Sequence, residues 1–424
     1  MTDTMLYIDP GTGSMLFSLI MALATTTVFV GREAFIKLKF LLSGGRARKA
    51  DSKRIPIVIY SDHKRYWNVF KPVLDEAERR GVDITYYTQS ADDPALSEPY
   101  AHIKAKFIGE GNRGFARLNF LKADVVLSTT PGLDVYQWKR SRDVGLYVHI
   151  PHTADELLGY RMFGMDSYDA VLLTGEFQGG YIRRLEKLRG EKEKDLAVVG
   201  STFLDGMRAR LGTSGTHPSA GGRLSVLLAP SWGKDAILSK YGGRILDALL
   251  ATGFDITIRP HPQTLSSEKD IVGPLQEKYP DTEMLHWNYD NDNFPVLERS
   301  DILITDFSGI ILEYALIFGK SLIYADTQLD TSPYDAAWID EPVWRLRILP
   351  EIGVRLDEAD FPNMRELVEN AVRSEAQRRN RERISGEAWQ NKGRAAEAVL
   401  DYLVAKQQEL SHAPEAGVSG GKAS

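Results

Sequence analysis

The feature that most constrains the fold is a repeated alternation of short β-rich runs with helical stretches, which begins at Arg54. The strand-like runs are 55–61, 83–88, 124–130, 144–150, 169–175 and 196–200, and then 224–230, 255–260, 283–287, 301–306 and 321–325. Between the first two runs, residues 66–81 have the apolar spacing of an amphipathic helix and end on a glycine. Strands that alternate with helices in this way predict parallel, doubly wound sheets.

The alternation stops once, at residues 212–222, and then restarts. This segment, GTSGTHPSAGG, has almost no apolar side chain and is typical of a linker. We therefore expect an α/β protein with two tandem Rossmann-like domains, residues 54–211 and 223–405, facing each other across a cleft, with a flexible tail at 406–424. With 424 residues, 43% of them hydrophobic, the chain is long and apolar enough to fill both cores.

An uncharged run from Met15 to Val30 precedes this pattern. A signal peptide is the alternative, but the basic segment that normally opens one is missing, so the run favours an uncleaved membrane anchor at about 14–31. No Lys or Arg precedes the run, whereas six follow it between Arg32 and Lys49. We therefore expect residues 1–50 to form a single-pass anchor and a basic juxtamembrane helix in the inner (plasma) membrane, with the catalytic domains in the cytoplasm.

Composition excludes several classes of function. A formal charge of −6 and a pI near 5.9 argue against a nucleic-acid-binding protein, which normally carries a basic excess. The chain contains no cysteine, so disulfides, thiolate nucleophiles and cysteine metal sites are absent. There is no His-Glu-x-x-His motif either, so we expect neither a metal nor a cofactor.

The run DITIRPHPQT places a histidine directly after a predicted strand. Pro260 and Pro262 prevent both strand pairing and helix, so they present His261 on a stiff loop, with Arg259 two residues before it. An ordinary strand-ending turn with a surface histidine is the alternative. In parallel α/β sheets, ligands bind at the carboxyl ends of the strands, and this loop lies there.

A second motif, SDILITDFSGIILEYALIFGK, reads as a buried strand followed by a helix. The strand ends at Asp306, and Ser308 and Gly309 open the helix, whose free N–H groups and positive end predict a phosphate site. Glu313, one turn into the helix, could accept hydrogen bonds from a ribose or glycerol hydroxyl. An ordinary N-cap is the alternative. Ser231, in LLAPSW, follows another strand and completes the set of candidate donor-binding residues.

In the first half, LYVHIPHTADE contains two histidines three residues apart. His149 falls within the predicted strand and fits a core histidine, whereas His152 lies beyond the strand end. A neutral histidine at the edge of a cleft is suited to take a proton from an attacking hydroxyl.

The motifs LLAPSW, TIRPHP and ERSDILITDFSGIILEYALIFGKSLIYA, in this order and with an upstream histidine, resemble the CDP-glycerol glycerophosphotransferases of wall teichoic acid synthesis, which have the GT-B fold. The resemblance covers about 144–324. It implies that Arg259 and His261 flank the donor pyrophosphate, that TDFSG binds donor phosphate or glycerol, and that His152 is the base. The family usually has Trp-His-Gly at the base and a second serine in place of Gly309.

These observations together predict a membrane-associated transferase. It would move glycerol phosphate, or a related polyol phosphate, from a CDP-linked donor to a hydroxyl of a lipid-linked glycan acceptor in the synthesis of a teichoic-acid-like or capsular polymer, releasing CMP. Two alternatives remain open. One is a GT-B glycosyltransferase that uses a nucleotide sugar, and the other is a noncatalytic membrane protein that binds nucleotides or glycans.

Overall fold

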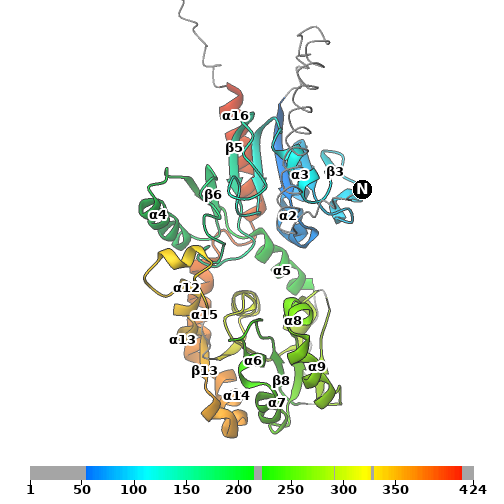
Figure 1. Ribbon diagram of the computed structural model, residues 1–424, viewed down its shortest axis with the longest axis vertical. Coiled ribbons are helices and arrows are strands. Elements are labelled where there is room, and N and C mark those ends of the chain that lie inside the picture. The colour runs from blue at the N-terminus through cyan, green and yellow to red at the C-terminus, as the bar shows by residue number, and fades with distance from the viewer. Residues whose placement is uncertain (1–53, 214–221, 291, 326–328, 413–424) are drawn as a thin grey trace, which may run out of the picture. The chain divides into compact units, whose positions relative to one another are not determined.

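The computed structural model describes residues 54–412 except 214–221, 291 and 326–328, and these residues belong to one compact unit (Figure 1). The predicted anchor at 14–31 lies outside the described residues. Among the helices that are described, none combines the length and the apolar character needed to cross a bilayer.

The first half is built on a parallel sheet of seven strands in the order β3-β2-β1-β4-β5-β6-β7. The strands are β1 (Ile55–Ser61), β2 (Ile84–Thr88), β3 (Ile103–Phe107), β4 (Ala123–Ser128), β5 (Val144–His149), β6 (Ala170–Leu173) and β7 (Asp195–Val198). The helices of this half are α2 (Trp67–Arg80), α3 (Asn112–Leu118) and α4 (Phe177–Arg189), which lie between strands, and α5 (Thr202–Thr213), which follows β7. The order reverses between β1 and β4, which is where ligands bind in sheets of this topology.

Helix α2 shows how the sequence pattern positions these elements. It buries one apolar face, which includes Val69, Phe70, Val73 and Leu74, against the sheet. Each such side chain stabilises the fold by about 1.5 to 3 kcal/mol. The helix ends at Gly81, whose φ of 68° is the left-handed conformation that glycine adopts at helix ends without strain.

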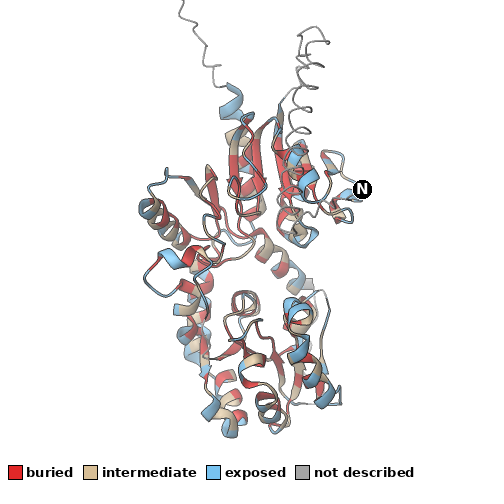
Figure 2. Cartoon of the chain, in the orientation of Figure 1, coloured by how far each residue is buried: buried red, intermediate tan, exposed pale blue. Residues whose placement is uncertain are grey.

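The second half repeats this plan with a parallel sheet of six strands in the order β10-β9-β8-β11-β12-β13. The strands are β8 (Ser225–Leu228), β9 (Asp255–Ile258), β10 (Leu285–Trp287), β11 (Ile302–Thr305), β12 (Ser321–Ala325) and β13 (Gly353–Leu356). The helices are α6 (Ile237–Tyr241), α7 (Gly243–Leu250), α8 (Pro262–Ser267), α9 (Lys269–Lys278), α10 (Phe294–Arg299), α11 (Ile310–Glu313), α12 (Trp344–Arg347), α13 (Leu349–Ile352), α14 (Met364–Val372) and α15 (Glu375–Ala388). Figure 2 shows the central strands of both sheets as buried, so each half has its own core.

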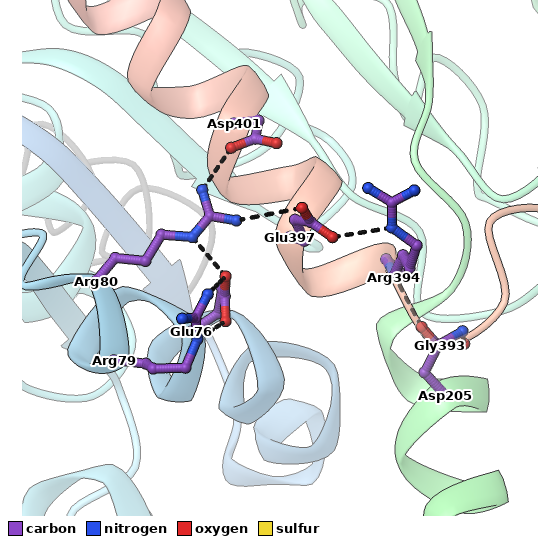
Figure 3. Close-up of polar contacts among 9 residues, drawn as sticks. Glu76, Arg79, Arg80, Asp205, Gly393, Arg394, Glu397 and Asp401 are labelled. Atoms are coloured by element: carbon purple, nitrogen blue, oxygen red, sulfur yellow. Dashed lines mark hydrogen bonds and ion pairs between the residues drawn. The ribbon is translucent and has the colours of Figure 1, made fainter.

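The last helix, α16 (Ala395–His412), returns to the first half and packs against α2, β1 and β4 (Figure 1). Val399, Leu400 and Leu403 enter the first core, and Arg80 of α2 pairs with Asp401 at 2.5 Å (Figure 3). The Asp205 carboxylate of α5 accepts the N–H groups of Gly393 and Ala395 at 2.8 and 3.0 Å, which fixes the start of α16. The predicted second domain, 223–405, therefore sends its final helix back to the first sheet.

Candidate functional site

A cavity of about 760 Å³ lies at the carboxyl ends of the strands and is lined by both halves of the chain. The first half contributes loops that follow β1, β4 and β5, and the second half contributes loops that follow β8, β9 and β11. Six of the predicted site residues line it: His152, Arg259, His261, Ser308, Gly309 and Glu313. The fold thus brings together residues that are up to 161 positions apart in the sequence (313 minus 152).

His261 lies on the loop after β9 and caps helix α8. Its Nδ1 accepts the backbone N–H of Gln263 at 3.1 Å, so the ring proton lies on Nε2. Burial lowers the pKa of His261, although the nearby carboxylates of Asp306 and Glu268 oppose this effect. The imidazole is therefore a neutral Nε2–H donor near neutral pH. The two prolines beside it, which also line the cavity, hold it in place.

Arg259 supplies a half-buried cation to the same wall. Its guanidinium donates to the side-chain oxygen of Asn288 and, at 2.7 Å, to the carbonyl of Asp290. These contacts orient the side chain. Burial lowers the pKa of Arg259, but arginine remains charged at any physiological pH.

The segment after β11 begins a helix where the sequence predicts one. A helical turn, α11, begins after Gly309 and continues as a π-helical turn over Tyr314–Phe318. Gly309 has ordinary helical angles, and a Cβ added there would meet no atom within 4 Å. Ser308 and Gly309 therefore leave open space in front of the helix start. Glu313, one turn further, accepts an N–H of Asn293 at 2.8 Å, and burial raises the pKa of Glu313.

Ser231 and Asp306 were also predicted to bind the donor, but neither lines the cavity. Asp306 is buried, and its carboxylate accepts the backbone N–H groups of Ser231 at 2.9 Å and Ile237 at 3.1 Å. It thereby ties the loop after β8 to the loop after β11. The structure gives this pair a role in holding the two loops and shows no surface of either on the cavity.

The two histidines of the first half have different surroundings. His149 is fully buried at the end of β5, where its Nε2 lies 3.0 Å from the Tyr160 hydroxyl, and burial lowers its pKa to about 3. His152 lines the cavity, and its Nδ1 lies 3.2 Å from Oγ1 of Thr129. Burial also lowers the pKa of His152, against the opposing charge of Asp155, so the ring is neutral.

Arg345, which lies in none of the predicted motifs, brings another cation to the cavity. It belongs to α12 in the second half and reaches the loop after β5, where it lies 3.5 Å from Asp155 and 3.7 Å from Glu156. Its backbone N–H donates to Glu156 at 3.0 Å, but its Nε has no hydrogen-bond partner among the residues that the structure describes. A Cβ at Gly159 would come within 3.2 Å of the guanidinium, so any larger residue there would press on the Arg345 side chain.

A second contact between the halves is a buried ion pair at Asp335, which joins the second half to the loop after β5. Asp335 accepts the backbone N–H groups of Phe163 and Gly164 at 2.8 and 3.3 Å and pairs with Arg189 of α4 at 2.5 Å. Backbone hydrogen bonds from Asp335 to Tyr160 and from Ala336 to Leu158 extend this contact. The loop that carries Tyr160 and Arg161 into the cavity is thus held by the second half.

The described residues contain no group of three or more His, Cys, Asp or Glu side chains that could hold a metal ion. The charges that face the cavity are instead the guanidinium groups of Arg161, Arg259 and Arg345, together with two carboxylates, Asp155 and Glu313. Guanidinium groups and N–H donors on one wall suit an anionic ligand such as a pyrophosphate.

Solved structures that are similar to this chain share its fold. The wall teichoic acid polymerase TagF is 13% identical over 90% of this chain and 98% of that one, with a TM-score of 0.52. The chain has the GT-B fold. Two further GT-B neighbours are a putative UDP-N-acetylglucosamine 2-epimerase from Listeria monocytogenes (14% identity, 83% and 96% coverage, TM-score 0.52) and the UDP-GlcNAc 2-epimerase from Neisseria meningitidis bound to UDP-GlcNAc (14%, 82% and 99%, 0.51).

No protein-family model and no curated protein sequence matches the chain. The resemblance found in the sequence motifs is confirmed in that TagF, a CDP-glycerol glycerophosphotransferase, is among the GT-B structures that this chain resembles. At 13% identity the similarity establishes the GT-B architecture.

Proposed function

We propose that this GT-B protein transfers glycerol phosphate, or a related polyol phosphate, from a CDP-linked donor to an acceptor hydroxyl and releases CMP. The observation that carries the proposal is the composition of the cavity wall. A neutral histidine of the first half, His152, shares one cavity with the Arg259, His261 and Ser308 set of the second half. The sequence resemblance supplies the donor class.

The second half would hold the donor. The Arg259 guanidinium neutralises pyrophosphate charge, the Nε2–H of His261 donates to a phosphate oxygen, and Ser308 adds a hydroxyl donor. Each hydrogen bond to a charged oxygen contributes about 1.5 to 3 kcal/mol. Because the prolines and the Gln263 contact fix the His261 ring before the ligand arrives, little rotational freedom is lost on binding.

The first half would hold the acceptor and accept its proton. The acceptor oxygen attacks the distal phosphorus of the donor, the bond from that phosphorus to the CMP oxygen breaks, and CMP leaves with the electron pair. The acceptor proton passes to Nε2 of His152, because Nδ1–H can donate to Thr129 Oγ1. Burial keeps His152 neutral and therefore able to accept a proton at neutral pH.

The test is incubation of the purified protein with a panel of CDP-polyols, UDP-sugars and lipid-linked acceptors, followed by mass spectrometry of the products. The proposal expects CMP and an acceptor heavier by one polyol phosphate. A donor that binds but is never turned over, with every acceptor tried, would favour a noncatalytic binding protein instead.

A nucleotide-sugar transferase is the second candidate, and the Glu313–Asn293 pair favours it. The pair places a carboxylate and an amide on the cavity wall, where they can bind neighbouring hydroxyls of a ribose or sugar. Under this alternative, Glu313→Gln would severely reduce turnover of the UDP-sugar. With a CDP-polyol donor the same change should have a milder effect.

Attachment to the membrane is part of the proposal and rests on the sequence of residues 14–31. Attachment would keep the cavity close to a lipid-linked acceptor and raise the effective concentration of that acceptor. Protease treatment of intact spheroplasts tests the topology, since digestion beyond Arg54 from outside would exclude cytoplasmic catalytic domains.

A further inference from the structure

The first half exposes a large aromatic side chain at the end of its sheet where the strands begin. Phe120, in the loop between α3 and β4, is 84% exposed. A single exposed phenylalanine is common on protein surfaces. This one lies in the loop before β4, which is bonded to the start of β1 and to the loop before β5. We define the basic edge as the exposed residues Arg117, Phe120, Lys122, Lys139 and Arg142.

Hydrogen bonds hold the segments of the basic edge side by side. The carbonyl of Lys122 accepts the N–H of Ile55, the first residue of β1, at 3.0 Å. The side-chain oxygen of Asn119 accepts the N–H of Lys139 at 2.8 Å, and the Ser141 hydroxyl donates to the carbonyl of Leu121 at 2.7 Å. These contacts hold the chain segments that carry Lys122, Lys139 and Arg142 next to one another, beside the loop that carries Phe120.

The charges of the basic edge are available to a partner. In the described part of the chain, Arg117, Lys122 and Arg142 have no carboxylate within ion-pair distance, and the Lys139 ammonium donates to the backbone carbonyl of Asp134. Of the nearby acids, Asp124 is paired with Arg54 at 3.2 Å, whereas Asp143, next to Arg142 in the sequence, is exposed. A local basic excess is notable on a chain with a net charge of −6.

The position of the basic edge in the chain points to its partner. Residues 1–53 join the described structure at Arg54, whose guanidinium donates to the carbonyls of Ala123 and Asp143 at 3.0 and 3.1 Å. The chain that carries the predicted anchor at 14–31 therefore joins the described structure at a residue that contacts this edge. Leu410, near the end of α16, is also partly exposed here beside Gly145 of β5.

We propose that the basic edge docks on the surface of an anionic bilayer, with Phe120 inserted among the headgroups and the four cations on lipid phosphates. The inference rests on the proposed membrane attachment and adds a second, electrostatic contact to it. Each Lys or Arg near an anionic membrane strengthens association by about fivefold. The proposed surface lies at the opposite end of the strands from the cavity, so it is separate from the catalytic residues.

The absence of cysteine makes a single-site test possible. Full-length Phe120→Cys protein, labelled with an environment-sensitive dye, is reconstituted in vesicles of phosphatidylcholine alone or of equal parts phosphatidylcholine and phosphatidylglycerol. Spin-labelled lipid is the quencher. We expect strong quenching at position 120 in the anionic vesicles, less in the neutral ones, and loss of the difference at high salt. Glu366→Cys, on an exposed position of α14, is the control and should show little quenching.

Adding Lys122→Glu and Arg142→Glu to the labelled protein should bring quenching down to the control level, with the melting temperature unchanged. Quenching at position 120 no stronger than at 366, in protein that floats with the vesicles, overturns the docking surface and leaves the anchor intact. Protein that fails to float with either vesicle overturns membrane attachment itself. A dye signal that depends on protein concentration and not on lipid charge assigns the surface to a second copy of the chain, which also overturns the proposal.

Discussion

The buried contact between Glu156 and Arg345 makes a quantitative prediction about pH. Glu156 is fully buried, and desolvation together with the neighbouring Asp155 raises its pKa to about 7, against the opposing charge of Arg345. The ordinary value is 4.5. The folded state therefore holds this proton more tightly than the unfolded state does. The stability that results is fully present below pH 4.5 and is lost as the pH rises through 7.

The size of the effect follows from the two pKa values. A difference of about 2.5 pKa units corresponds to about 3 kcal/mol of unfolding free energy. Glu156→Gln keeps the shape and one acceptor for the Arg345 N–H but cannot titrate. We expect the wild type to lose about 3 kcal/mol relative to this variant between pH 4.5 and pH 8.

Urea denaturation of both proteins at a series of pH values measures the difference. Glu76→Gln is the matched control, because its pairing with Arg79 and Arg80 on the surface of α2 lowers the pKa of Glu76 to about 2. Its contribution is therefore lost only at acid pH, and this variant should parallel the wild type over the same range. Parallel curves for Glu156→Gln and the wild type between pH 4.5 and pH 8 would refute the reasoning.

Three further outcomes separate chemistry from packing. His261→Ala should abolish CMP release with little change in melting temperature, because the ring lies on a loop; near wild-type release would remove it from the mechanism. Ser308→Ala should weaken donor binding by roughly tenfold to a hundredfold, and Gly309→Val by at least as much without unfolding, both measured by calorimetry. His149→Ala should lower the melting temperature by leaving a cavity beside Tyr160. Complete loss of activity at an unchanged melting temperature would contradict a core role for His149.

Much of the fold could be predicted because the strands of a parallel sheet are buried on both faces. The run at 55–61 matches β1 residue for residue, and the helix predicted at 66–81 is α2 with one residue fewer at each end. Strand β3 was missed because it lies at the sheet edge and carries Lys104 and Lys106, which interrupt any apolar run. Strand β13 was also missed, because it has only four residues, one of them arginine, and so forms no apolar run.

The position of a candidate site residue was predictable where the residue directly follows a buried strand, and not where tertiary contacts bring it to the cavity. Arg259 and His261 follow β9, so their location needed only the rule for parallel sheets. Arg345 follows no strand of this kind, and only the packing of α12 against the loop after β5 brings it to the cavity. Asp306 shows the opposite case, since a position at a strand end did not reveal that its carboxylate faces inward to the backbone of Ser231.

Strand β1 separates the basic edge from the cavity, and its length bears on the size of the acceptor. The strand has seven residues, so its two ends lie about 20 Å apart. On the proposed docking of the basic edge, an acceptor whose lipid remains in the bilayer would have to extend at least this far to place its terminal hydroxyl near His152. A carrier with a single sugar would then be too short, whereas a glycan of several units or a growing polymer would be long enough. Chain length would then act as the selection rule, with early intermediates left to another enzyme.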